Sequence, residues 1–183
     1  MNSNESHIAP VPMAGSAAAL RRLFDDSFAA AAASKSERLQ DLLAIRLGSD
    51  PYALRLSEIT GLHAGMKIVA VPSPAAQLLG IVGLRGTLAP IYDLAALLRY
   101  PPAASPRWIV LARMPQPVGF AFETFESHLQ VPEASLANGE GEGANAGAAR
   151  QHTSGTVRGA GALRPIIRMA SVVELIGAMT HDR

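Results

Sequence analysis

The sequence contains no cysteine. This absence excludes disulfides, thiolate zinc sites and cysteine nucleophiles, and it is compatible with a cytosolic protein. The N-terminus also lacks a basic segment followed by an apolar run, so no secretory signal is predicted. No stretch approaches the roughly 20 uninterrupted apolar residues that a membrane-spanning helix needs. We therefore expect a soluble protein of the cytoplasm.

An excess of charge of one sign is also missing, because 16 basic residues balance 15 acidic ones and leave a net charge of +1. Nucleic-acid-binding proteins usually carry a basic stripe and exposed aromatic residues for stacking. This chain has one Trp, three Tyr and five Phe. We therefore predict binding neither to nucleic acid nor, by charge alone, to a membrane surface. Its 183 residues, 49% apolar, suffice for one domain or for two small units that share an interface.

The sequence also lacks the residue patterns of an active site or a metal site. The glycine-rich tract at 139–147 has no Lys-Ser/Thr of a phosphate-binding loop. Glu123 and Glu126 are three residues apart, so in a strand they would point to opposite faces. The five histidines show no pairing at helical or hairpin spacing, and we expect them at the surface: His7, His63, His128, His152 and His181. We predict no enzyme, no metal and no cofactor.

Residues 1–39 are predicted to form a disordered tail followed by an amphipathic helix. The first fifteen residues carry polar residues, prolines and small residues without periodicity. Leu20, Phe24 and Phe28 then recur at every fourth position, and Ser16 fits the N-cap position. The apolar stripe of this helix can dock on the body of the protein or bind a partner, and docking is the simpler interpretation.

From residue 41 the apolar residues alternate with period two, which predicts a β-rich chain. The segments 42–47 and 52–57 flank a Gly-Ser-Asp-Pro turn and form a predicted hairpin. A further strand is predicted at 68–71, where prolines follow.

Two more strands are predicted to meet at the turn formed by Arg85 and Gly86, and Asp93 is predicted to lead into a short helix over 94–98. Glycine at this turn allows a positive φ. By physics alone, Arg85 is equally compatible with a structural salt bridge and with a recognition residue at an interface.

The second half of the sequence repeats the first. Setting the hairpin turn at Pro117 against the turn at Pro51 gives an offset of 66 residues. The segment Gly86-Thr-Leu-Ala-Pro-Ile matches Gly161-Ala-Leu-Arg-Pro-Ile at an offset of 75 residues. The difference falls on a flexible Gly/Ala-rich insert at about 137–150. A duplicated β unit, folded as two small barrels side by side, is the architecture that this repeat predicts.

The segment from Leu79 to Leu94, Leu-Gly-Ile-Val-Gly-Leu-Arg-Gly-Thr-Leu-Ala-Pro-Ile-Tyr-Asp-Leu, resembles the signature of CheW-like domains. In that signature an Asn-Leu-Arg-Gly turn is followed by Pro, two apolar residues, Asp and Leu. The resemblance extends over about residues 40–178. Gly83 replaces the usual Asn, and Arg168 stands at the repeat position of Asp93.

This resemblance implies a mainly β fold of two SH3-like five-stranded barrels with short helices. It also implies a non-catalytic adaptor that couples the cytoplasmic tip of methyl-accepting chemoreceptors to the regulatory domain of a CheA-type histidine kinase. Carried over by position, the partner-binding residues would be Ile59, Gly80, Leu84, Arg85 and Gly86. The structural positions of the motif would be Pro90, Asp93, Gly161 and Pro165.

The predicted organisation is a tail and helix over 1–39, a CheW-like domain over 40–178 and a C-terminal tail over 179–183. The alternative is a β-barrel that binds a small ligand or nucleic acid and has no connection with chemotaxis. Weak retention on a DNA or heparin resin would favour the adaptor over the nucleic-acid-binding alternative.

Overall fold

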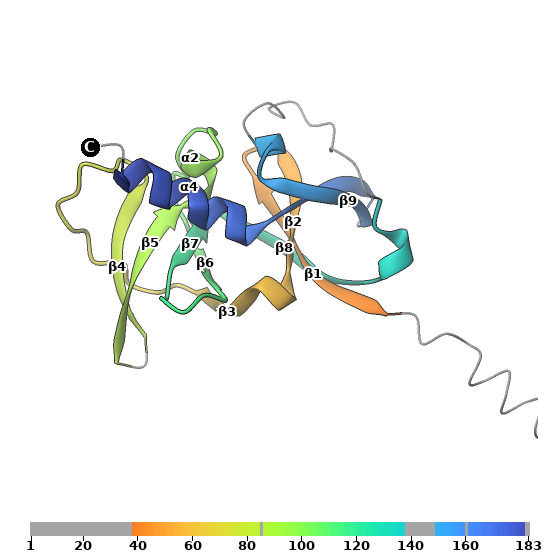
Figure 1. Ribbon diagram of the computed structural model, residues 1–183, viewed down its shortest axis with the longest axis horizontal. Coiled ribbons are helices and arrows are strands. Elements are labelled where there is room, and N and C mark those ends of the chain that lie inside the picture. The colour runs from red at the N-terminus through yellow and green to blue at the C-terminus, as the bar shows by residue number, and fades with distance from the viewer. Residues whose placement is uncertain (1–37, 85, 138–148, 160, 182–183) are drawn as a thin grey trace, which may run out of the picture. The chain divides into compact units, whose positions relative to one another are not determined.

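The computed structural model describes residues 38–84, 86–137, 149–159 and 161–181 (Figure 1). The predicted tail and amphipathic helix lie outside the described residues, as do Arg85 and most of the predicted insert. The description below therefore concerns the β-rich domain that begins at Arg38.

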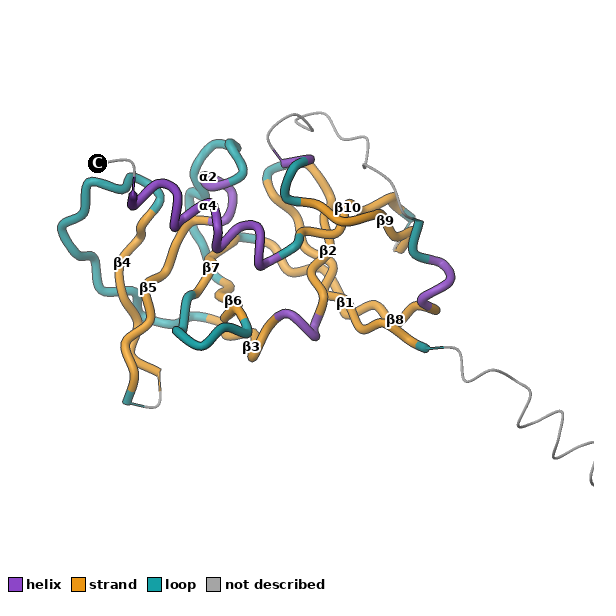
Figure 2. Tube along the Cα trace, in the orientation of Figure 1, coloured by secondary structure: helices purple, strands orange, loops and turns teal. Residues whose placement is uncertain are grey.

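Ten strands form two five-stranded sheets, as expected for a mainly β fold with two small barrels (Figure 2). Barrel A has the strand order β8-β1-β2-β10-β9, and barrel B has the order β3-β6-β7-β5-β4. The strands of barrel A are β1 (Leu39–Leu47), β2 (Asp50–Arg55), β8 (Thr124–Pro132), β9 (Thr153–Gly159) and β10 (Ala162–Ile167). The strands of barrel B are β3 (Ile59–Ala64), β4 (Leu78–Leu84), β5 (Thr87–Asp93), β6 (Trp108–Ala112) and β7 (Gly119–Phe122).

Four short helical segments connect or follow these strands. They are the 3-10 turns η1 (Leu56–Glu58) and η2 (Glu133–Ser135) and the α-helices α2 (Leu94–Leu97) and α4 (Met169–His181). The helix α2 agrees with the helix predicted after Asp93. The helix α4 runs past residue 178, where the domain was predicted to end.

The duplication seen in the sequence is present in the strand pairing. In barrel B the parallel strands β5 and β7 place Ile91 opposite Gly119, and in barrel A the parallel strands β10 and β2 place Ile166 opposite Ala53. These two pairs are related by the same offsets of 75 and 66 residues that the sequence repeat gives. Both anchors of the predicted repeat are therefore confirmed by the register of the sheets.

The two halves of the chain exchange their first hairpins. The hairpin β1–β2 belongs to the first half but lies in barrel A with β8, β9 and β10 of the second half. Conversely, the hairpin β6–β7 completes barrel B with β3, β4 and β5. Neither half can therefore form a five-stranded barrel by itself, because each supplies only two or three strands to each sheet.

A pair of isolated bridges closes the barrels at equivalent places. Val69 and Ile81 exchange two backbone hydrogen bonds of 2.9 Å in barrel B. Ala137 and Thr156 do the same in barrel A, with bonds of 2.9 and 3.0 Å. Each bridge ties the segment that leaves one edge strand to the strand at the opposite edge, which is what closes a sheet into a barrel.

The prediction of a strand at 68–71 is wrong. Val69 is in the isolated bridge with Ile81, and its neighbours are irregular. The strand that the sequence interpretation missed is β3, which pairs with β6 just before this segment. The alternation in β3 is weak because Gly61 and His63 interrupt it, so the apolar run at 68–71 gave the stronger local signal.

Three apolar clusters hold the described residues together. One lies inside barrel B and includes Ile91 and Ile109, and another lies inside barrel A and includes Leu42 and Ile166. The third and largest contains buried residues of both barrels and of both α-helices, among them Ile45, Leu54, Val110, Phe120 and Val172. The joint between the barrels is therefore a core in its own right.

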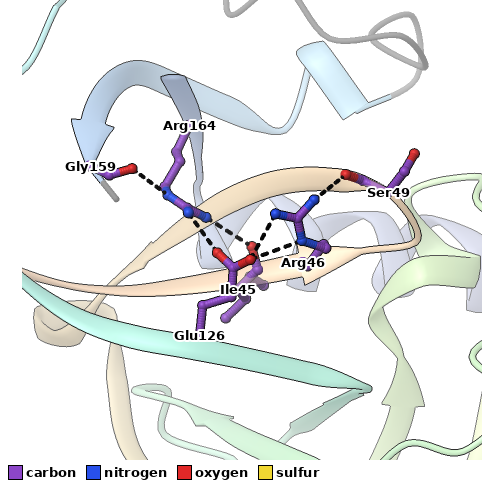
Figure 3. Close-up of polar contacts among 6 residues, drawn as sticks. All are labelled: Ile45, Arg46, Ser49, Glu126, Gly159 and Arg164. Atoms are coloured by element: carbon purple, nitrogen blue, oxygen red, sulfur yellow. Dashed lines mark hydrogen bonds and ion pairs between the residues drawn. The ribbon is translucent and has the colours of Figure 1, made fainter. Parts of the chain in front are cut away.

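The interior of barrel A also holds an ion pair (Figure 3). The side chain of Arg164 is almost completely buried, and its Nη2 lies 2.6 Å from Oε2 of Glu126. Nε of Arg164 donates to the carbonyl oxygen of Gly159 at 3.1 Å. The partly exposed Arg46 lies 2.8 Å from Oε1 of the same carboxylate. Glu126 thus joins β1 to β10 through two arginines, one from each half of the chain.

The two arginines set the protonation state of Glu126. Burial by itself would raise the pKa of this carboxyl group, but the hydrogen bonds and charges of Arg46 and Arg164 outweigh it, so the pKa is lowered. The carboxylate therefore stays ionised, which is the state that a buried guanidinium requires.

Candidate partner-binding site

The β4–β5 hairpin carries most of the residues that the sequence singled out. Its last pair is Leu84 opposite Thr87, and the turn between them contains Gly86 with a φ of +83°. Gly86 is exposed, and Leu84 is half-buried against the core of barrel B. Arg85 stands between them in the sequence and lies outside the described residues. Three of the five predicted partner-binding residues are thus on this hairpin, at Gly80, Leu84 and Gly86.

The outer face of this hairpin is apolar. Val82 and Ala89 are paired and point into barrel B, so Gly83 and Leu88, which are also paired, point outward. Leu88 is 66% exposed, and no atom lies within 4 Å of the position that a Cβ of Gly83 would occupy. The missing side chain leaves one side of Leu88 uncovered.

A second row of apolar residues lies beside Leu88. Ile81 is paired with Pro90 on one side and with Val69 on the other, so the three side chains share the outer face. Val69 is 53% exposed. We refer to Val69, Ile81, Leu88 and Pro90 together as the hairpin face.

The corresponding surface of barrel A is more polar. Leu163, at the repeat position of Leu88, is 44% exposed and is paired with Arg158 instead of a glycine. The row next to it contains Ala137 and Thr156 where the hairpin face has Val69 and Ile81.

Gly80 has a backbone role that the family position did not reveal. Its φ is +146°, and a Cβ there would overlap the carbonyl oxygen of Val69. The carbonyl oxygen of Val69 accepts the Ile81 N–H of the bridge that closes barrel B. A side chain at Gly80 would therefore disturb this closure, whatever its effect on a partner.

Ile59 lies elsewhere, at the first residue of β3, where the chain passes from barrel A to barrel B. Its side chain is only 5% exposed and belongs to the core between the barrels. Arg113 holds this crossover by donating from Nη2 to the carbonyl oxygen of Ile59 and from Nε to that of Ser57, both at 2.9 Å. The position thus supports the joint between the barrels.

The four structural positions of the motif have clear local roles. Pro90 and Pro165 lie opposite Ile81 and Thr156 in the paired hairpins, and Gly161 has a φ of +76° at the turn before β10. Asp93 is the N-cap of α2, because its Oδ1 accepts the N–H of Ala96 at 3.2 Å. Asp93 also accepts the N–H of Ala103 through Oδ2 at 2.8 Å.

The second half replaces this cap by a residue from the first half. Arg168 stands where Asp93 stands in the repeat and cannot accept a hydrogen bond. Instead, Oε2 of Glu58 in η1 accepts the N–H of Met169, the first residue of α4, at 2.7 Å. Nη1 of Arg55 lies 3.4 Å from the other carboxylate oxygen. The sequence repeat gave no sign of this substitution, because the two residues are 111 positions apart.

The described residues contain no group of three or more His, Asp or Glu side chains that could hold a metal ion. Among them, no helix is both long and apolar enough to span a bilayer. The expectation of surface histidines is wrong for His152, which is 8% exposed and hydrogen-bonded to Ser171. Its position in the second barrel places it under α4, which spacing alone could not show.

Comparison with known proteins places the chain in a family. The model of the CheW-like domain matches residues 41–177. The chain belongs to the CheW-like domain family. The resemblance seen in the sequence is thereby confirmed, together with the extent that it was given.

Two individual proteins resemble this CheW-like chain. A probable chemotaxis protein CheW of Rhizobium etli is 31% identical over 77 residues, which is 42% of this chain and 48% of that protein. The matched segment thus spans about half the length of this relative. The crystal structure of the scaffolding protein TtCheW from Thermoanaerobacter tengcongensis superposes with a TM-score of 0.60 at 17% identity. That match covers 70% of this chain and 88% of the other, and it supports the fold.

The hairpin face was not identified from the sequence. Leu88 was read only as one letter of the repeated Gly-x-Leu-x-Pro-Ile motif. The strand alternation that buries Ala89 could have shown that Leu88 points outward. Its pairing with Gly83 needed the register of the hairpin, and the contribution of Val69 needed the closure of the barrel.

Proposed function

We propose that this protein is a non-catalytic adaptor that couples a chemoreceptor tip to the regulatory domain of a CheA-type histidine kinase in the cytoplasm. Membership of the CheW-like family supports the adaptor class. The names of its relatives, a chemotaxis protein and a scaffolding protein, point to the same kind of role. The described residues offer surfaces for partners and no convergent set of reactive groups.

The observation that carries this proposal is the apolar hairpin face beside the turn at Gly86. A leucine that is two-thirds exposed, next to a valine that is half exposed, is typical of a surface that a partner covers. Protein interfaces combine such an apolar centre with arginine at high frequency. Arg85 follows Leu84 at the tip of the same hairpin, and we assign it to this interface.

Binding measured by calorimetry tests the proposal. The ligands are the kinase regulatory domain and a receptor-tip fragment from the same organism, each alone and then together. Saturable binding with a Kd in the micromolar range is expected, as for transient signalling contacts. If neither ligand binds at concentrations of hundreds of micromolar, the adaptor role is wrong for these partners.

The variant Leu88→Glu locates the contact. It introduces a charge on an exposed position, so the fold should be retained while binding of at least one partner weakens by tenfold or more, about 1.4 kcal/mol. Leu163→Glu is the matched control, because it makes the same change at the repeat position of barrel A. Equal loss of binding in both variants would mean that the contact is not confined to the hairpin face.

A further inference from the structure

The first turn of α4 rests on a buried histidine. The imidazole Nδ1 of His152 lies 2.8 Å from Oγ of Ser171, and both side chains are buried. The backbone reinforces this contact, since the N–H of Arg168 donates to the carbonyl oxygen of His152 at 2.8 Å. His152 thus meets the chain at the point where β10 ends and α4 begins.

This first turn matters for the joint between the barrels. Met169 and Val172 are buried in the core that both barrels share, and Val173, Ile176 and Met179 pack against it. The N–H of Met169 is held by Glu58 from the first half of the chain. Any loosening of this turn therefore acts on the core that joins the barrels.

The surroundings of His152 disfavour its protonated form. Burial is the main reason that its pKa is lowered, and the positive charge of Arg168 adds to the effect, while Glu174 on α4 opposes it. The N-terminal end of a helix carries a partial positive charge, which also disfavours a cation there. The folded protein therefore holds this imidazole neutral under conditions where an exposed histidine is partly charged.

We propose that His152 is an acid-sensitive latch, which seats the first turn of α4 on the core between the barrels while it is neutral and releases it when it takes up a proton. Above the ordinary histidine pKa of 6.5, the imidazole is neutral in the seated and the released states, and pH has no effect. Below 6.5 the released state binds a proton that the seated state excludes, so release becomes more favourable. The effect stops growing when the pH falls below the lowered pKa of the seated state.

Amide hydrogen exchange of the full-length protein between pH 7.5 and 5.5 tests the latch. After correction for the intrinsic exchange rate, amides of α4 should open up to about tenfold more per pH unit below 6.5, the slope expected for one proton. Amides of β4 and β5 should not follow this slope. The same pH range stays above the ordinary carboxyl pKa values of about 4, so carboxylates contribute little.

Two variants separate the latch from general acid sensitivity. His152→Gln removes the titratable group but keeps a side chain that can bond Ser171, and it should abolish the pH dependence of exchange in α4. His128→Gln is the matched control on the exposed β8 strand, and it should leave that dependence unchanged. An α4 whose exchange does not change with pH, or changes equally in His152→Gln, would overturn the proposal.

A measurement on the unaltered protein does not depend on whether the variants fold. The NMR signals of the His152 ring should report a neutral imidazole at pH 6, while His128 or His63 serve as internal references. Titration of His152 with a midpoint at or above 6.5 would also overturn the latch.

Discussion

The two barrels are built on one repeated plan but differ in where they place charge. At the repeat positions Ala89 and Arg164, barrel B has a methyl group inside and barrel A has a buried guanidinium paired with Glu126. At the positions Gly83 and Arg158, barrel B has no side chain outside and barrel A has an arginine. Barrel B thus combines an apolar interior with an apolar outer face, whereas barrel A is polar in both places.

This difference shows that the repeat preserves the backbone and not the chemistry of its surfaces. The turn glycines, the prolines and the strand register recur, because they fix the hairpins. Side chains between them were free to change. One barrel could therefore keep a surface suited to a partner while the other acquired an internal ion pair.

The largest expected effect comes from breaking the ion pair of barrel A. Glu126→Ala leaves Arg164 buried without a carboxylate, and the free energy of unfolding should fall by about 3–5 kcal/mol. Chemical denaturation measures the loss. Glu123→Ala is the control on the neighbouring segment, where Oε1 accepts the exposed Ser105 N–H, and it should cost well under half as much. The double variant Glu126→Leu with Arg164→Met should recover most of the stability, and its failure to do so would contradict this account of the pair.

A smaller effect is expected from disturbing the closure of barrel B. Gly80→Ala places a Cβ against the carbonyl of Val69 at a positive φ, and it should cost about 2–3 kcal/mol. Gly83→Ala has open space around its Cβ and should change stability by less than about 1 kcal/mol. Thermal unfolding of the two variants makes the comparison. Equal effects would mean that the Val69–Ile81 bridge does not need the glycine.

The smallest effect concerns the two helix caps. Glu58→Ala removes the carboxylate that accepts the N–H of Met169, and it should cost about 1 kcal/mol, as should Asp93→Ala at α2. Hydrogen exchange distinguishes them, since the first variant should expose α4 and the second α2. Faster exchange of both helices in either variant would show that the caps are not local.

Much of the fold could be predicted because it depends on neighbours in the sequence. The β1–β2 hairpin, the turn at Gly86 and the helix after Asp93 follow from alternation, turn residues and a capping carboxylate. The candidate site could be predicted only in part. Leu84 and Gly86 are on the exposed hairpin, whereas Ile59 lies in a core and Gly80 closes a barrel. A family position gives the location of a residue, and the packing around it decides whether a partner can reach it.

The sequence by itself determined the mainly β class, the duplication and its two offsets, because these are recorded in residue types and spacings along the chain. The tertiary structure decided the exchange of hairpins between the halves, the capping of α4 by Glu58 and the burial of His152. These features join residues that are distant in sequence. Their free energy comes from closing two barrels around a shared core, and no local pattern specifies which half supplies the missing strands.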